Sequence, residues 1–176
     1  MKDYTPFKEN GKVEAAAPEP YPPLEVEGPN PQYARLLGID MAGGRGEMTS
    51  ITQYLYHSWT LPDFDNAAPT LRQIAQVEMH HLDIFGRLAY LLGADPRLWT
   101  YTRRRPMYWS PGCNQYPRQL RELLQNALKG EEEAIKKYKR QAESIKDPYI
   151  TANLHRIIED EKLHIEIFQT LCRQYL

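Results

Sequence analysis

Cysteine and long apolar segments are scarce in this 176-residue sequence, which contains two cysteines, Cys113 and Cys172. Two cysteines so far apart cannot build a disulfide framework or a cysteine-based zinc site, and they fit a reducing compartment. No stretch reaches the roughly 18 apolar residues of a membrane helix, and the first residues lack the apolar core of a signal peptide. These absences predict a soluble, cytoplasmic protein.

Neither positive nor negative charge is in clear excess. The sequence contains 22 Lys and Arg residues and 23 Asp and Glu residues, which leaves a net charge of −1. The overall field would therefore not attract a polyanion such as nucleic acid. Residues 99–109 do mix arginine with aromatic residues, which could stack on bases or cover an active-site mouth. We favour packing of these aromatic residues on the protein and salt bridges for the arginines, and we expect no nucleic-acid or membrane partner.

Alternating strand patterns of useful length are absent too, whereas helical periodicity is frequent. The chain has the length of one domain with a continuous core. Apolar residues recur at three- and four-residue spacing in four long segments, and a shorter helix is expected before them. The fold class is therefore predicted to be all-α, with a short helix at about 31–41 and long helices at about 46–59, 69–92, 117–145 and 148–176.

Fourteen prolines would be unusual in a helical protein, but their positions explain them. Seven fall within the first 31 residues, where the run 17–23 can only be extended, and the other seven lie between helical segments. We expect an extended proline-rich arm at 1–30 and one helical domain at 31–176. The glycines at 43–46 separate the short helix from the first long one, and Gly93 is a plausible C-cap.

The lengths of the connections predict how the long helices are arranged. The links near 60–68 and 146–147 are short, so the first two long helices should be antiparallel neighbours, and so should the last two. About two dozen residues, 94–115, lie between the second and third long helices. This length allows a long crossover in a four-helix bundle, although a surface loop would also fit.

The second and fourth long helices each contain a Glu-x-x-His motif, formed by Glu78 and His81 and by Glu161 and His164. A Glu and a His three residues apart project from one helix face, and both are natural ligands for iron, manganese or zinc. Two copies of so short a motif are only a mild excess over chance. The surrounding sequence must therefore decide whether they form a site.

The first and third long helices each contain a Gly-Glu pair followed by a tyrosine two helical turns later, with Glu47 and Tyr54 in one and Glu131 and Tyr138 in the other. Each Glu should share a helix face with its Tyr. The two Gly-Glu pairs are 84 residues apart and the two Glu-x-x-His motifs 83, so the halves repeat in register. Each tyrosine could hydrogen-bond a carboxylate ligand or be oxidised, and packing in the core is an equal alternative.

Burial of the glutamates is the physical reason to expect a metal. Glu131 occupies an apolar-stripe position between Ala127 and Ala134, and an unpaired carboxylate in a core is strongly unfavourable. Two halves would bring together four carboxylates and two imidazoles, as in di-iron and dimanganese bundles. Neighbouring acidic and histidine residues are expected to face solvent or an interface, while His57, about 80° from Glu47, stays unassigned. These outward-facing residues are Glu132, Glu133, Asp160, His80 and His155.

The motifs resemble those of the ferritin-like superfamily over about 20–92 and 118–172. Residues 30–37, 43–47 and 54–62 resemble the first segment of manganese catalases and their spore-coat relatives, while 160–164 resembles a bacterioferritin or rubrerythrin helix. The resemblance implies a ferritin-like antiparallel four-helix bundle with a long crossover. It also implies two metal ions per chain, manganese or iron, held by Glu47, Glu78, His81, Glu131, Glu161 and His164.

Departures from these families narrow what the resemblance implies. The second helix-three glutamate of rubrerythrins is replaced by Ala134, and a Cys-x-x-Cys rubredoxin module is absent, which argues against a usual rubrerythrin peroxidase. In manganese catalases the helix-four glutamate accepts protons beside the metals, so ligand and proton acceptor are alternatives for Glu161. The other catalytic candidates are Tyr54 and Tyr138.

The expected function is that of an oxidoreductase acting on hydrogen peroxide or dioxygen. It would be catalase-like with manganese and peroxidase-like or ferroxidase-like with iron, and the same ligands suit both metals. The alternative is a non-catalytic protein that binds or stores metal, or one that assembles into a coat with the arm mediating association. A homo-oligomer is expected, with no subunit number assigned.

Overall fold

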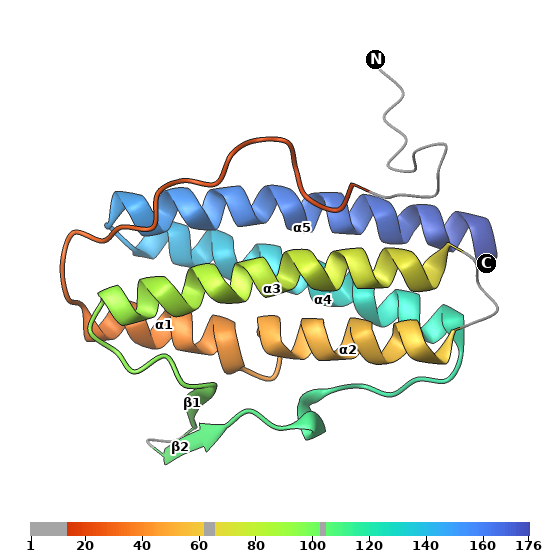
Figure 1. Ribbon diagram of the computed structural model, residues 1–176, viewed down its shortest axis with the longest axis horizontal. Helices are drawn as coiled ribbons and strands as arrows, with labels where there is room; N and C mark the ends of the chain where they lie inside the picture. The colour runs from red at the N-terminus through yellow and green to blue at the C-terminus, as the bar shows by residue number, and fades with distance from the viewer. Residues whose placement is uncertain (1–13, 62–65, 103–104) are drawn as a thin grey trace.

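A computed structural model describes residues 14–61, 66–102 and 105–176 of the chain (Figure 1). Most of these residues are helical, which confirms the predicted all-α class. A short 3-10 helix, Pro111–Cys113, and a two-stranded hairpin lie between the second and third long helices. The helices are α1 Pro31–Ala42, α2 Glu47–Thr60, α3 Ala67–Leu91, α4 Leu120–Ser144 and α5 Pro148–Tyr175, and the strands are β1 Trp99–Thr102 and β2 Arg105–Tyr108.

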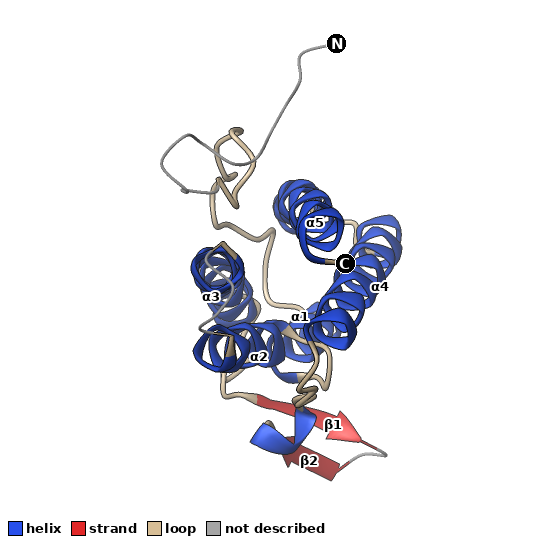
Figure 2. Ribbon diagram, turned by 90° about the vertical axis from the view of Figure 1, so that its right-hand side faces the viewer, coloured by secondary structure: helices blue, strands red, loops and turns tan. Residues whose placement is uncertain are grey.

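The four long helices α2 to α5 form the bundle, and α1 continues the line of α2 (Figure 1). Helix α2 packs against α3, and α4 packs against α5, as the short links predict. Because α3 and α4 run in the same direction, the chain must return along the bundle between them (Figures 1 and 2). Residues 92–119 make this return, so the predicted long crossover is confirmed.

Helix ends follow from a few capping residues. The side chains of Asn30 and Asp147 accept hydrogen bonds from first-turn backbone N–H groups of α1 and α5, and each is followed by a proline at the first helical position. Gly93 has a φ of 90° and ends α3 as predicted. Helix α4 begins at Leu120, three residues later than the position of Pro117 predicted.

The crossover contains an antiparallel hairpin that the sequence pattern did not predict, in which Trp99 pairs with Tyr108. Each strand has four residues, too few to show a clear alternation. The indole N–H of Trp109 donates to Thr49 Oγ1 of α2 at 3.0 Å, whereas Met107 and Tyr108 are exposed. The expected packing of aromatic residues on the bundle is thus found for Trp109 but not for Tyr108. Residues 103–104, two of the predicted salt-bridging arginines, lie outside the described residues.

The described part of the arm, 14–30, contains no helix or strand and runs along α5 (Figure 1). Its backbone is held there by side chains of α5 and of its cap. The carbonyl of Pro23 accepts a hydrogen bond from Asn153 Nδ2 at 3.1 Å, and the N–H of Glu27 donates to Asp147 Oδ2 at 2.7 Å. The arm is therefore a docked part of the fold over these residues.

Two apolar clusters fill the ends of the bundle and leave a polar layer between them. On α3, the buried residues up to Ala75 belong to one cluster and those from Ile84 onward to the other, with Glu78 and His81 in between. The same division occurs on α5. The polar layer is thus enclosed by apolar packing at both ends. None of the helices that the structure describes is long and apolar enough to cross a membrane.

Candidate metal centre

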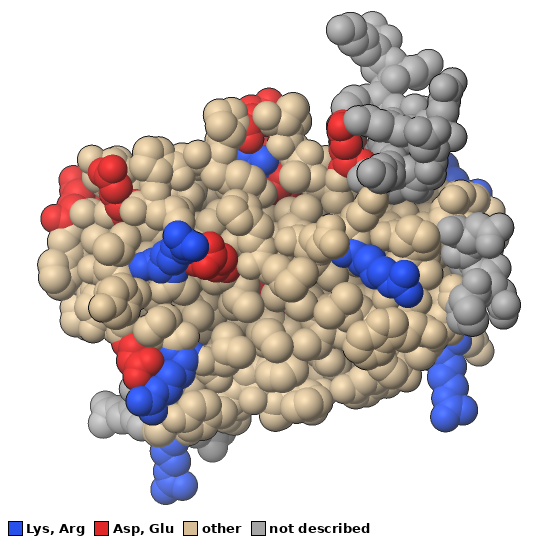
Figure 3. All heavy atoms as spheres, in the orientation of Figure 1, with Lys and Arg blue, Asp and Glu red and all other residues tan. Residues whose placement is uncertain are grey.

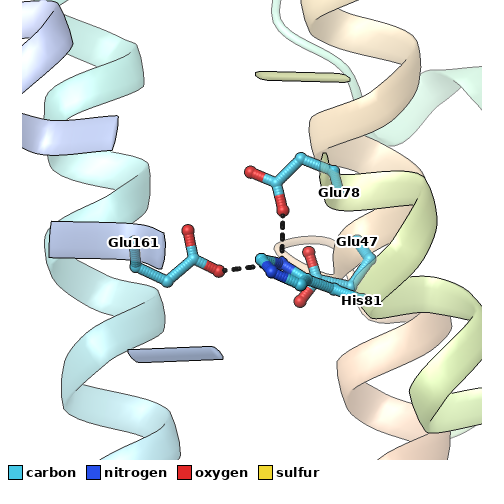
Figure 4. A group of neighbouring side chains, drawn as sticks. All are labelled: Glu47, Glu78, His81 and Glu161. Carbon is cyan, nitrogen blue, oxygen red and sulfur yellow. Dashed lines mark hydrogen bonds and ion pairs between the residues drawn. The ribbon is translucent and has the colours of Figure 1, made fainter. Parts of the chain in front are cut away.

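Four glutamates and two histidines meet in this polar layer, each no more than 2% exposed. They come from four different helices, and four of them are drawn in Figure 4. The structure brings together all six residues that the repeated motifs predict. They are Glu47 of α2, Glu78 and His81 of α3, Glu131 of α4, and Glu161 and His164 of α5.

The six side chains form two overlapping groups, and within each group the potential ligand atoms lie within 4.8 Å of one another. Glu78 and Glu161 belong to both groups. Each group is completed by one further glutamate and one histidine, which are Glu47 and His81 in the first and Glu131 and His164 in the second. Two shared carboxylates between two Glu-His sets are the arrangement expected for a dinuclear centre.

The donor atoms fit a pair of metal cations. The Nδ1 atom of His81 lies 3.1 Å from Glu78 and 3.5 Å from Glu161, as the dashed lines in Figure 4 show. His164 Nδ1 lies 3.1 Å from Glu161 and 3.4 Å from Glu78. The buried Oε1 of Glu78 accepts no hydrogen bond, and the nearest cationic group is His164 Nδ1 at 3.4 Å. This oxygen is therefore available to a bound cation, and carboxylate with imidazole suits iron and manganese.

Without cations, protons neutralise the site. Burial, together with the negative charges of Glu78 and Glu161, raises the pKa of Glu47 and of Glu131 well above the ordinary value. Burial lowers the pKa of the two histidines, but hydrogen bonds with surrounding carboxylates outweigh it and raise their pKa well above 6.5. Metal ligands must be deprotonated, so cations would replace these protons when they bind.

The two tyrosines connect the halves of the bundle crosswise. The hydroxyl of Tyr54 on α2 donates to Glu131 on α4, and the hydroxyl of Tyr138 on α4 donates to Glu47 on α2. Each tyrosine thus hydrogen-bonds the glutamate of the other half, and each ring also packs in one of the apolar clusters. Burial and the negative charge of Glu131 raise the pKa of Tyr54 well above 10, so the phenol keeps its proton.

The predicted solvent-facing position of Asp160 is wrong, because its side chain is fully buried. The carboxylate accepts hydrogen bonds from His81 Nε2 at 2.9 Å and from the Arg156 guanidinium at 2.6 Å. Burial raises the pKa of Asp160, but hydrogen bonds from His81, Arg156 and Tyr21 outweigh it and bring the pKa to about 2. Asp160 therefore holds the His81 ring with Nδ1 toward the shared carboxylates. The angular position of Asp160 on its helix predicted exposure to solvent, but the arm covers this side of α5 and buries the side chain.

A ferritin-like domain profile matches residues 45–175, which include all six residues of the site. The chain belongs to the ferritin-like family. This match confirms the resemblance to the ferritin-like superfamily that the sequence motifs indicated. Among curated proteins, no sequence relative of this ferritin-like chain is found.

Solved structures share this ferritin-like fold at low sequence identity. The manganese catalase KatB from Anabaena superposes with a TM-score of 0.78 and 18% identity over 90% of this chain and 78% of that chain. The bacterioferritin of Rhodobacter capsulatus gives 0.69 and 24% over 84% and 88%, and BfrA of Mycobacterium tuberculosis gives 0.65 and 24% over 83% and 87%. At sequence identities of 18–24%, the similarity to these structures shows a shared fold.

A pocket of about 120 Å³ reaches the site of this ferritin-like protein between α2 and α4. It extends from the exposed side chains of Arg45 and Lys129 to the buried glutamates. Gly130 lines it, and a Cβ atom added there would meet nothing within 4 Å. A small side chain would therefore fit at position 130, whereas a larger one would extend into the open space along the pocket. At the mouth, Lys129 carries a positive charge, while the charge of Arg45 is paired with Glu133.

The remaining residues around the ferritin-like centre lie mostly as predicted. Glu132, His80 and His155 are exposed, and Glu133 forms an ion pair with Arg45. His57, which the sequence left unassigned, is buried near the end of α2 and belongs to neither group of ligands. Burial lowers its pKa to about 4, so its imidazole is neutral at neutral pH.

Proposed function

We propose that this protein is a dinuclear metal oxidoreductase that acts on hydrogen peroxide or dioxygen. The observation that carries the proposal is the sharing of Glu78 and Glu161 between two buried groups of potential ligands. The description of one fold neighbour as a manganese catalase, and of the Desulfovibrio desulfuricans bacterioferritin as having a diiron site, supports it. The proposed ligands are Glu47, Glu78, His81, Glu131, Glu161 and His164.

Two adjacent manganese or iron ions, when bound, would supply two-electron redox chemistry toward peroxide or dioxygen. The chain itself orients the ligands. Glu161 faces both histidine Nδ1 atoms, which favours a shared ligand over a separate proton acceptor. Tyr54 and Tyr138 hold protons at one oxygen of Glu131 and of Glu47, and we assign them as positioning residues.

The pocket favours a small substrate. Its volume of about 120 Å³ is well below the roughly 300–1,000 Å³ of pockets that bind drug-sized ligands. Hydrogen peroxide and dioxygen fit this space. The apolar clusters on both sides of the site limit the access of water by other routes.

The test combines metal analysis with an oxygen electrode. Protein purified from its native source should contain about two manganese or two iron ions per chain. A manganese-loaded protein should release O2 from hydrogen peroxide, and an iron-loaded protein should consume peroxide or O2. A protein that holds its metal but is inert to both oxidants would overturn the enzymatic function and leave metal storage as the conclusion.

Replacement of Gly130 with leucine should separate metal binding from substrate access. The leucine side chain would project into the pocket, so kcat/KM toward hydrogen peroxide should fall about 10-fold or more, while metal content stays the same. The substitution should also raise the free energy of unfolding by roughly 0.5–1 kcal/mol, because glycine is a poor helix former. Gly130→Ala is the matched control, with the same gain in stability and near-wild-type activity. Full activity of Gly130→Leu would show that substrate enters elsewhere.

A further inference from the structure

The two histidines of the centre differ in what holds their outer nitrogen. His81 Nε2 contacts Asp160, the residue directly before the Glu-x-x-His motif of α5, at 2.9 Å. In the repeated register, the corresponding partner for His164 would be Val77, which has no polar side chain. His164 Nε2 instead lies 3.0 Å from the backbone carbonyl of Ala15 in the arm. A backbone group 149 residues away thus occupies the place that the internal repeat leaves empty.

We infer that residues 15–21 form a strap that completes the metal centre. In this arrangement the Ala15 carbonyl positions His164 as Asp160 positions His81, and metal loading and strap docking stabilise each other. The inference rests on the proposed function, because it assigns the strap a role toward the two metal ions. It makes the proline-rich arm a part of the site.

The strap is docked by a buried ion pair. Arg156, 6% exposed, donates to the carbonyls of Ala17 and Glu19, both at 2.7 Å, and its guanidinium lies 4.1 Å from the centre of the Tyr21 ring. Asp160 accepts the N–H of Ala17 at 2.7 Å and the hydroxyl of Tyr21 at 2.6 Å. The carboxylate that orients His81 therefore also anchors the strap.

The position of the strap leaves the pocket free. It contacts α5, and the Tyr21 ring lies 4.4 Å from that of His80 on α3. Figure 2 shows the arm beside α3 and α5, whereas the pocket opens between α2 and α4. Figure 3 shows this face of the molecule, on which Lys and Arg are scattered among Asp and Glu without a large patch of one sign. The strap therefore covers the rear of the centre and need not move for a substrate to enter.

The mutual stabilisation follows from the histidine geometry. The Nε2–H of His164 donates to the Ala15 carbonyl, and a cation held by Nδ1 and the neighbouring carboxylates would fix the ring in the orientation that keeps this hydrogen bond. A metal that tightens strap docking must, by linkage, be bound more tightly when the strap is docked. The coupling can therefore be measured from either side.

Metal release to an excess of chelator measures the coupling from the metal side. Ala17→Pro removes the N–H that donates to Asp160, and Tyr21→Phe removes the hydroxyl but keeps the ring over Arg156. Each single variant should release metal roughly 2- to 10-fold faster. The double variant should release it about 10- to 100-fold faster, the usual effect of losing outer partners of metal ligands. Glu19→Ala is the control, because its side chain is exposed while its backbone carbonyl is retained.

Hydrogen–deuterium exchange of the wild-type chain measures the coupling from the strap side and needs no variant. Exchange of the Ala17 amide should slow when metal is loaded. Unchanged exchange on loading, or equal metal release by wild type and the double variant, would overturn the inference. A wild-type protein that holds two ions but is inert to peroxide and O2 would overturn only the proposed enzymatic function, whereas one that holds no metal would overturn both.

Discussion

Replacing Glu161 with alanine is expected to reduce the metal content from about two ions per chain to near zero. Glu161 belongs to both groups of potential ligands, so its loss removes an oxygen donor and a negative charge that both cations would share. The measurement is elemental analysis after dialysis against metal-free buffer. Helix content by circular dichroism, recorded on the same samples, separates loss of ligands from loss of fold.

Exposed neighbours on the same helices provide matched controls. Glu159→Ala on α5 and Glu132→Ala on α4 each remove a carboxylate that faces solvent, so both variants should keep wild-type metal content. Glu131→Ala should fall below two ions per chain, because it removes a donor from one group only. Wild-type metal content in Glu161→Ala would refute the assignment of shared ligands.

Replacing Asp160 with alanine is expected to lower the free energy of unfolding by about 3–5 kcal/mol, because it leaves the buried Arg156 without its carboxylate. The change also removes the hydrogen-bond acceptor of His81 and of the arm. In a chain of this length the melting temperature should fall by roughly 10 °C. Urea unfolding of the metal-free protein measures this effect without the contribution of bound metal.

The acid side of the stability curve gives an independent check on Asp160. Its pKa of about 2 in the folded protein lies below the ordinary value of 3.8. The stabilisation is therefore present above about pH 4 and is lost as the pH falls toward 2, so Asp160→Ala should show a flatter pH dependence there. Arg156→Met combined with Asp160→Leu should recover part of the lost stability. A loss below about 1 kcal/mol in Asp160→Ala would contradict the role given to this ion pair.

Apolar periodicity predicted the helices, and the internal repeat predicted the convergence of the six polar residues. Apolar stripes fixed the helix faces, and glutamates within those stripes indicated a common interior. The crosswise pairing of Tyr54 with Glu131 and of Tyr138 with Glu47 was not predicted, because it depends on how α2 and α4 face each other. A short hairpin in the crossover left too little pattern to be detected.

The contribution of the arm could not be predicted from side-chain types. Its contacts with His164 and Arg156 use backbone carbonyls, which every residue has, and they join positions more than 130 residues apart. The buried state of Asp160 follows from the same contacts. Arg156, one helical turn before Asp160, was the signal that could have indicated a buried ion pair on this face of α5.

Anomalous diffraction from crystals of the manganese-loaded protein tests the dinuclear centre most directly. Two manganese peaks per chain are expected in the polar layer, one beside Glu47 and His81 and one beside Glu131 and His164, with Glu78 and Glu161 between them. A single peak in this layer, or peaks confined to surface carboxylates, would contradict the shared-ligand centre.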